Sequence, residues 1–139
     1  MTSSPSDSGQ TAAMSEETAT NLALAKKYED LYNTDVDRFV TECYTPDCTV
    51  NGGEIAGYDQ FLKVEKRVLR RAPRRTMRVD HSHATGDVVV VQARLLDPDQ
   101  GEHWYLPFCA VLTCREGRIA SDWTYAEFAK WPGLGGTGL

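Results

Sequence analysis

The chain has 139 residues, 41% of them hydrophobic and 25% charged, and it carries a formal net charge of −5 at pH 7. These values are typical of a single soluble globular domain with one core, and they give no sign of a nucleic-acid partner. No apolar run is long enough to cross a bilayer and no secretory signal pattern begins the chain, so we expect a cytoplasmic protein without a membrane partner.

The first half of the chain predicts a polar tail followed by three helices. Residues 1–14 are rich in Ser, Thr, Asp, Gly and Gln, which predicts a disordered N-terminal tail. The first helix is predicted from Ser15, a suitable cap that is followed by two glutamates at the positive end of the helix dipole. Thr34 is the predicted cap of a second helix, which Pro46 ends. A third helix is predicted from Gly57.

Beyond Pro73 the hydrophobic pattern changes to the period of strands. Short turns join four predicted strands, over residues 74–84, 88–96, 102–114 and 118–126. Short connections make consecutive strands antiparallel neighbours, and a further short extended piece is predicted over residues 48–51. The fold class is therefore α+β, with three N-terminal helices packed on a curved antiparallel sheet.

The C-terminal end is predicted to lie outside this domain. Residues 131–139 are rich in glycine and are predicted to form a tail, with Trp131 and Leu134 docked on the surface. The folded domain is therefore expected over residues 15–130.

The four cysteines form two pairs, but four residues separate the members of each pair instead of the two residues typical of zinc ribbons and redox motifs. Small buried thiols in a reducing compartment are the favoured interpretation, and no metal site is predicted. These residues are Cys43, Cys48, Cys109 and Cys114.

Three segments resemble the nuclear transport factor two-like superfamily, which includes ketosteroid isomerase, limonene epoxide hydrolase and SnoaL-like polyketide cyclases. They are Y-T-P-D-C-T-V at 44–50, G-Y-D-Q-F at 57–61 and R-E-G-R-I at 115–119. The order of the predicted elements is also similar to that of the superfamily. The resemblance implies a cone-shaped α+β barrel with an internal pocket, but the fold alone does not specify a function.

The resemblance to ketosteroid isomerase implies one site residue, but a second residue of that family's site is absent from this chain. Tyr28 on the first helix matches the oxyanion tyrosine of that family, whereas Gly52 falls where the family keeps its aspartate base. Steroid isomerisation by that mechanism is therefore not expected, because nothing replaces the base that moves the proton.

The resemblance to limonene epoxide hydrolase implies an arginine at Arg94. The partner aspartates of that family fall at Leu96 and Thr124, and its water-holding pair falls at Asn51 and Gly53. The acid-base relay is therefore without its carboxylates. An epoxide hydrolase-like enzyme with an altered active site is kept as a second alternative.

SnoaL-like cyclases carry an aspartate on the final strand, at about Thr124 of this chain. Asp122 lies two residues earlier and so on the same side of that strand, which makes it the best substitute acid or base. We predict that Asp122, Arg94 and Tyr28 converge on one pocket as catalytic residues, with Arg94 and Asp122 paired. The alternatives are a surface carboxylate, a solvated or interfacial arginine and a packed core tyrosine.

Five further residues are candidates for substrate binding. Three are aromatic residues on the strands, which suit either a hydrophobic ring-shaped ligand or a subunit interface. Met77, Val79, His81 and His83 are predicted to share one strand face, and the alternative for His81 is a surface histidine. The predicted substrate-binding set is Asn51, Trp104, Phe108, Trp123 and His81.

Basic residues concentrate around the third helix, from Lys63 to Arg78. A solvated helix face is the default interpretation. An anion site for phosphate, for a thioester-linked carrier or for RNA is the less favoured alternative.

These observations favour a cofactor-free enzyme that isomerises, cyclises, dehydrates or hydrates a small hydrophobic alicyclic or polycyclic metabolite by general acid-base catalysis. The alternative is a non-catalytic ligand-binding or protein-interaction module of the same fold, which the missing carboxylates support. A homodimer packed through the outer face of the sheet is also predicted, since that face carries apolar side chains that no helix covers.

Overall fold

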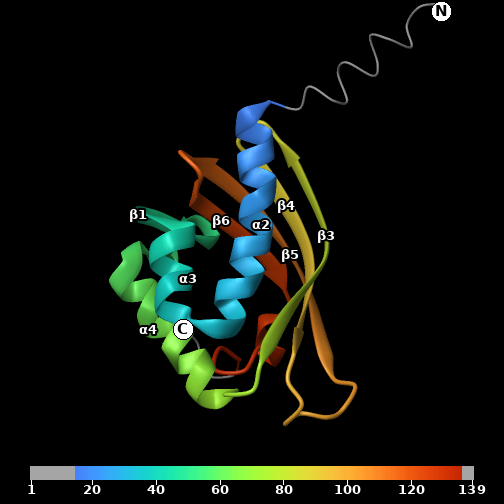
Figure 1. The fold of residues 1–139 in the computed structure, drawn as a ribbon. Coiled ribbons are helices and arrows are strands. Elements are labelled where there is room, and N and C mark those ends of the chain that lie inside the picture. Colours follow the sequence, from blue (N-terminus) through green and yellow to red (C-terminus); the bar gives the residue numbers. More distant parts are fainter. Residues whose placement is uncertain (1–14, 136–139) are drawn as a thin grey trace, which may run out of the picture.

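The computed structural model describes residues 15–135, so the predicted tail over residues 1–14 lies outside the described range. As predicted, three helices precede the four long strands: α2 (Glu16–Thr34), α3 (Val36–Cys43) and α4 (Gly57–Arg71) (Figure 1). None of the described helices is both long and apolar enough to cross a membrane.

The predicted helix starts are correct at two of the three helices. Ser15 caps α2 and α4 begins at Gly57. Thr34 does not cap α3, because its hydroxyl donates a hydrogen bond to the carbonyl of Asp30 at 2.7 Å and so stays within α2. The cap is Asp35, whose carboxylate accepts a hydrogen bond from the backbone N–H of Arg38 at 3.2 Å.

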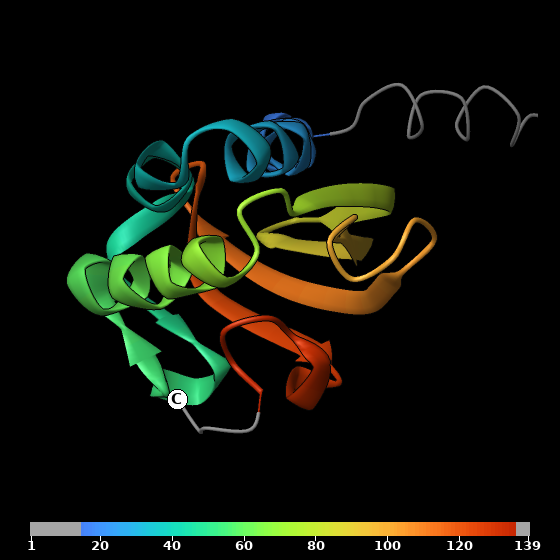
Figure 2. The ribbon, with the colours of Figure 1, turned by 90° about the horizontal axis from the view of Figure 1, so that it is seen from below.

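The sheet has six strands in the order β2-β1-β6-β5-β4-β3. The four predicted strands correspond to β3 (Thr76–Thr85), β4 (Val88–Leu96), β5 (Tyr105–Arg115) and β6 (Arg118–Ala126), which form the expected antiparallel meander. The predicted extended piece is part of a longer strand, β1 (Tyr44–Val50), which pairs antiparallel with β2 (Ile55–Ala56) and parallel with β6. The sheet is therefore mixed and open. Figure 2 shows the helices on one side of the curved strands.

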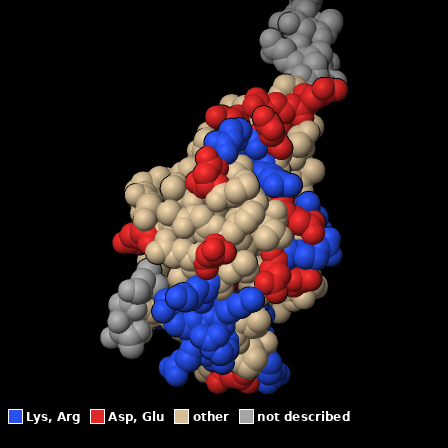
Figure 3. Space-filling view, turned by 90° about the vertical axis from the view of Figure 1, so that its left-hand side faces the viewer, with Lys and Arg blue, Asp and Glu red and all other residues tan. Residues whose placement is uncertain are grey.

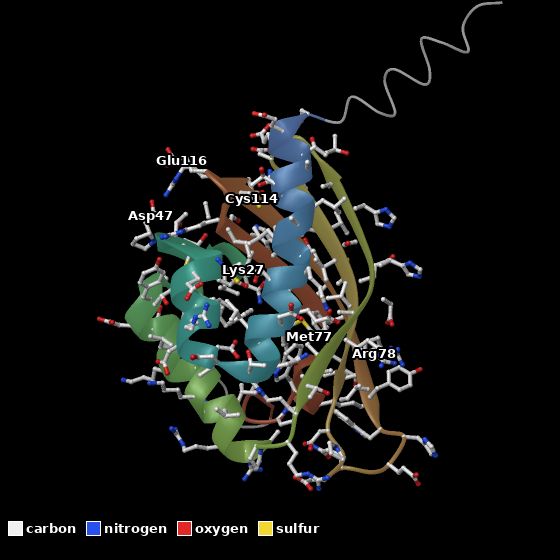
Figure 4. The ribbon with its side chains drawn as sticks, in the orientation of Figure 1. Lys27, Asp47, Met77, Arg78, Cys114 and Glu116 are labelled. Atoms are coloured by element: carbon white, nitrogen blue, oxygen red, sulfur yellow. The ribbon has the colours of Figure 1, made fainter. Side chains whose placement is uncertain are left out.

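A β-bulge in β3 reverses which side chains face the helices in the second half of the strand. Val79 pairs with Ala93 and His81 with Gln92, so Asp80 is an extra residue without a partner in the ladder. Met77 and Val79 face the helices, whereas His81 and His83 point outward after the bulge. The prediction that these four residues share one face is therefore wrong. Figure 4 shows Met77 on the helix side of β3 and its neighbour Arg78 on the opposite side.

A second bulge lies in β6 and decides which residues of that strand face the helices. Cys114 pairs with Ile119 and Thr113 with Ser121, so Ala120 is the extra residue. Ile119 is fully buried before the bulge, and the even-numbered residues, including Asp122, face the helices after it. Strict alternation from Ile119 would have pointed Asp122 away from the helices.

The core is aromatic where the helices meet the sheet. The ring of Phe39 on α3 lies 5.3 Å from the ring of Tyr28, 5.2 Å from that of Tyr32 and 5.5 Å from that of Tyr44, measured between centroids. These tilted and edge-on arrangements are favourable beyond the area they bury. They fix the positions of three tyrosines that also border the cavity described below.

The described part of the predicted C-terminal tail is packed against the domain. Trp131 follows the short helix η2 (Phe128–Lys130) and is 8% exposed, with its ring centroid 5.2 Å from that of Phe108. Trp131 is therefore in the core and not on the surface. Residues 136–139 lie outside the described range.

Candidate functional site

A cavity of about 250 Å³ lies between the helices and the inner face of the sheet. Much of its wall is apolar and comes from α3, α4, four strands and the C-terminal segment: Phe39, Val50, Ile55, Phe61, Val64, Met77, Phe108, Phe128, Trp131 and Leu134. The polar part of the wall consists of Tyr28, Tyr32, Tyr44, Asn51, Glu54, Glu65, Asp122 and Thr124. An apolar cavity with a few polar groups is the usual form of a small-molecule site.

Asp122 is the most deeply buried carboxylate of this wall, at 3% exposure. The hydroxyl of Tyr44 donates a hydrogen bond to its Oδ2 atom at 2.6 Å, and the hydroxyl of Thr124 donates one to its Oδ1 atom at 2.6 Å. Burial raises the pKa of Asp122 above its ordinary value, and these two hydrogen bonds oppose the rise. Asp122 is therefore a buried carboxyl group with a raised pKa, facing an apolar cavity.

The sheet and α4 hold the partners of Asp122 in place. Asp122 pairs with Val50 of β1 on one side and with Leu112 of β5 on the other, so it sits on an interior strand. The ring of Tyr44 meets that of Phe61 edge-on at 4.7 Å between centroids, and this contact fixes the direction of its hydroxyl.

Glu65 on α4 is a second carboxyl group in the same wall. Burial raises its pKa to about 7, the nearby Asp122 adds to the rise and Arg75 opposes it. Its Oε1 atom is buried and has no hydrogen-bond partner among residues 15–135. Two carboxyl groups with raised pKa values in one cavity are typical of sites for proton transfer.

Arg75 lies directly behind this part of the wall, in the connection between α4 and β3. It is 5% exposed, and its guanidinium carbon lies 4.1 Å from the centroid of the Tyr32 ring. Burial raises the pKa of Tyr32 as it does that of Glu65, and the charge of Arg75 opposes both rises, as expected for three close neighbours.

Two predicted site residues, Tyr28 and Asn51, line the cavity together with Asp122. Burial raises the pKa of the Tyr28 hydroxyl well above its ordinary value, and the charge of Asp122 adds to the rise. The Oδ1 atom of Asn51 accepts a hydrogen bond from the backbone N–H of Thr124 at 2.9 Å. This bond ties the turn after β1 to β6 beside Asp122.

Arg94 does not join Asp122 and Tyr28, so the predicted convergence of the three and the Arg94 to Asp122 pair are wrong. Ala93 and Leu95 occupy the inner positions of β4, and Arg94 points to the outer face of the sheet. There its guanidinium donates two hydrogen bonds to the carboxylate of Asp80, at 2.8 and 2.9 Å. With its arginine outside the cavity, the epoxide hydrolase-like alternative is without its main support.

The predicted substrate-binding residues divide between the two faces. Phe108 and Asn51 line the cavity, but His81 and Trp123 lie on the outer face and Trp104 lies near the C-terminal segment, outside the cavity wall. Trp123 is 45% exposed, and a Cβ atom at Gly52 would lie 2.8 Å from its ring. Trp123 therefore packs on the outside of the turn that carries Asn51.

The basic residues around α4 form a patch on the surface, as Figure 3 shows at the lower end of that view. Lys66 forms an ion pair with Asp37 at 3.1 Å, and Arg74 forms one with Asp99 at 2.8 Å. These exposed pairs agree with the interpretation of a solvated face.

The sequence predictions missed six polar residues in or directly behind the cavity wall: Tyr32, Tyr44, Glu54, Glu65, Arg75 and Thr124. Glu65 carries a signal, since it lies four residues after Phe61 and three before Val68, within the buried stripe of α4. Tyr44 was considered only as the first residue of the 44–50 segment, Thr124 only as a missing acid, and Arg75 only as part of the basic cluster from Lys63 to Arg78. Across residues 15–135, no three His, Cys, Asp or Glu side chains are grouped as a metal site.

The sequence profile of the SnoaL-like domain matches residues 25–122. The chain belongs to this family. The match runs from α2 to Asp122 on β6 and covers well over half of the chain. No curated protein matches the sequence.

Solved structures share the fold of this SnoaL-like protein. A candidate SnoaL-like polyketide cyclase from Jannaschia sp. is 19% identical with a TM-score of 0.70, covering 82% of this chain and 90% of that one. IdmH, a candidate polyketide cyclase from Streptomyces antibioticus, is 17% identical with a TM-score of 0.68, covering 78% and 93%. A Catenulispora acidiphila protein with a ketosteroid isomerase-like fold is 15% identical with a TM-score of 0.66, covering 78% and 88%. The match to the SnoaL-like domain, together with this shared fold, places the chain in the nuclear transport factor two-like superfamily.

Proposed function

We propose that this SnoaL-like protein is a cofactor-free enzyme that isomerises, cyclises, dehydrates or hydrates a small hydrophobic ring compound, with Asp122 as its general base. The observation that carries the proposal is the Asp122 carboxylate, buried in the wall of an apolar cavity and held by two hydroxyl groups at 2.6 Å. A raised pKa brings a carboxyl group closer to neutral pH, where a general base works best.

Isomerisation, cyclisation and dehydration of a carbonyl compound share one elementary step, the removal of a proton from the carbon beside the carbonyl group, and hydration is the reverse of dehydration. The Asp122 carboxylate takes this proton, becomes a neutral carboxylic acid, and leaves the substrate as an enolate. In an isomerisation the same acid returns the proton to another carbon. In a cyclisation the enolate carbon bonds to a second carbonyl carbon and the proton goes to the resulting alkoxide. Tyr28, in the same wall, is placed to donate a hydrogen bond to the enolate oxygen.

The size of the cavity limits the substrate. A volume of about 250 Å³ with aromatic walls suits a compound of one or two fused rings better than a long flexible chain. We therefore place the substrate at the small end of the alicyclic and polycyclic range.

The proposal can be tested without knowing the natural substrate, because proton abstraction can be followed on a simple ketone. The probe is 2-tetralone in D₂O, whose exchange of hydrogen for deuterium beside the carbonyl is measured by proton NMR. The protein should accelerate this exchange over buffer, and Asp122→Asn should abolish the acceleration. Asp80→Asn is the matched control, since Asp80 is a carboxylate on the outer face. Equal acceleration by wild type and Asp122→Asn would refute the role of Asp122.

A non-catalytic binding module is the second candidate, and one observation favours it. Both oxygens of Asp122 already accept hydrogen bonds from Tyr44 and Thr124, as expected for a carboxylate with a purely structural role. If 2-tetralone binds in the cavity without any accelerated exchange, this candidate replaces the enzyme.

We also propose that the protein is a homodimer that packs through the outer face of the sheet. Tyr105, Trp123 and Tyr125 on this face are 53%, 45% and 59% exposed, which is unusual for large apolar side chains that lie together on one face. Sedimentation at micromolar concentration should give the mass of two chains, and Trp123→Glu should shift it toward one. A wild-type monomer would contradict the proposal. The cytoplasmic location expected from the sequence stays a prediction.

A further inference from the structure

A buried guanidinium without an ionic partner lies behind the wall of the cavity, against the ring of the wall residue Tyr32. Arg75 is 5% exposed, yet its Nε and Nη2 atoms have no hydrogen-bond partner among residues 15–135. No carboxylate of the described residues lies within ion-pair distance of it, whereas Arg94 on the outer face has such a partner in Asp80. Buried charges in proteins are normally paired, because an unpaired one loses its hydration without compensation.

Two wall residues beside Arg75 have unused hydrogen-bonding groups as well. The hydroxyl of Tyr32 and the Oε1 atom of Glu65 are buried and have no partner in the described chain. Both residues line the cavity, and the guanidinium of Arg75 stacks on the ring of Tyr32 at 4.1 Å. Three neighbouring side chains, one cationic, one phenolic and one carboxylic, therefore each have a buried hydrogen-bonding atom without a partner.

We propose that Tyr32, Glu65 and Arg75 form a subsite for an ionised carboxylate on the ligand, so that the protein takes hydrophobic ring compounds that carry an acid group. In this arrangement the protonated carboxyl group of Glu65 donates a hydrogen bond to the ligand carboxylate, and Arg75 supplies the balancing positive charge. The Tyr32 hydroxyl donates a further hydrogen bond. The apolar rings of the wall, Phe61 and Phe108 among them, cover the rest of the ligand.

The subsite makes binding depend on pH through Glu65. The groups that face Glu65 are Tyr28 and Tyr32 from α2, Tyr44 from β1, Asp122 from β6 and Arg75 from the α4–β3 connection, and α3 contributes the apolar Phe39. Burial raises the pKa of Glu65 to about 7. Above that pH the ionised Glu65 neutralises Arg75 and repels a second carboxylate. A ligand carboxylate therefore binds best below it, together with one proton.

The inference specifies a substrate class for the proposed enzyme and rests on the cavity being its substrate site. Its test is a binding measurement, so it can fail while the exchange of 2-tetralone succeeds, and the reverse. The probes are 2-naphthoate and its neutral amide, 2-naphthamide, which have the same ring system and nearly the same shape. Affinities are measured by isothermal titration calorimetry.

At about pH 6 we expect wild type to bind 2-naphthoate about tenfold or more tightly than 2-naphthamide. Arg75→Met should remove this preference and leave the binding of 2-naphthamide unchanged. Replacing an unpaired buried charge by an apolar side chain of similar length is rarely destabilising, so the variant should fold. Arg94→Met removes a guanidinium from the outer face and should keep the preference.

The second arm uses pH. Between about pH 6 and about pH 8 the affinity of wild type for 2-naphthoate should fall about tenfold, whereas Glu65→Gln should bind it equally at both pH values. Equal binding of the two probes by wild type, a preference that survives Arg75→Met, or no binding of 2-naphthoate at millimolar concentration would each overturn the proposal.

Discussion

Two carboxylates on the same sheet, Asp122 and Asp80, show how one scaffold produces opposite electrostatic environments. Asp80 lies on the outer face, where the guanidinium of Arg94 lowers its pKa. Asp122 lies on the inner face, where burial raises its pKa and its two partners are uncharged hydroxyl groups. The difference shows that the pKa of a carboxylate on this sheet depends on which face of the sheet the side chain lies on.

The largest expected effect is on proton exchange. Asp122→Asn should lower the enzyme-dependent exchange of 2-tetralone by about 100-fold or more, the usual contribution of a general base. Asp80→Asn should change it by less than about twofold, because it alters only an exposed ion pair. Circular dichroism of both variants serves as the folding control. Comparable losses in the two variants would break the contrast between the faces.

The next effect is on stability and concerns the inner carboxyl group of Glu65. Its pKa of about 7 in the folded protein lies above the unfolded value of about 4.3, so its contribution to stability falls as pH rises from the lower value to the higher one. Glu65→Gln should therefore raise the free energy of unfolding at about pH 8 by on the order of 2 kcal/mol and by little at about pH 5. Urea denaturation at the two pH values measures this difference. A pH-independent difference would show that Glu65 titrates normally.

A smaller effect concerns the hydroxyl that holds Asp122. Tyr44→Phe removes a hydrogen bond that favours the ionised carboxylate, so the pKa of Asp122 should rise by about one unit. The pH at which exchange reaches half its maximal rate should move up by the same amount. Tyr58→Phe is the matched control, because its hydroxyl donates to the backbone carbonyl of Tyr44 at 2.7 Å and not to Asp122. An unshifted profile in Tyr44→Phe would mean that the base is another group.

The smallest effect is expected on the outer face. Arg94→Met removes the group that lowers the pKa of Asp80, so that pKa should return toward its ordinary value. The pKa of Asp122 should not change, since Arg94 is not among the groups that affect it. Carboxyl carbon chemical shifts followed by NMR over a pH range report both groups separately. A shift at Asp122 would show that the two faces are coupled through the sheet.

Most of the fold could be predicted from the sequence, because it follows from local patterns. The helical stripe of α4 and the turn residues between the strands set most element boundaries to within a few residues. The parallel partner of β1 was not predicted, since no short connection joins it to β6. Pairing between strands that are distant in sequence leaves no local signal.

The site was predicted only in part, again because contacts between residues that are distant in sequence leave no local signal. Tyr28 and Asp122 were placed by resemblance and strand parity, and the cavity contains both. The alternation of side chains along β4 left open whether Arg94 faces the cavity or the outside of the sheet. The observed burial of Ala93 and Leu95 decides that Arg94 faces the outside. The bulge at Asp80, which turns His81 outward, is visible only in the register with β4. Glu65 was the one missed residue with a clear signal, a carboxyl group in an apolar stripe.

The extra residue at Ala120 can be lost without changing which residues of β6 face the cavity. Loss of the single codon for Ala120 would remove the bulge, yet Ile119 would still oppose Cys114 and Ser121 would still oppose Thr113. Asp122 would therefore keep its place in the cavity wall, and the local twist of β6 would change instead. In lineages that carry this strand, a deletion of one residue at the bulge can thus adjust the shape of the cavity while its acid is retained.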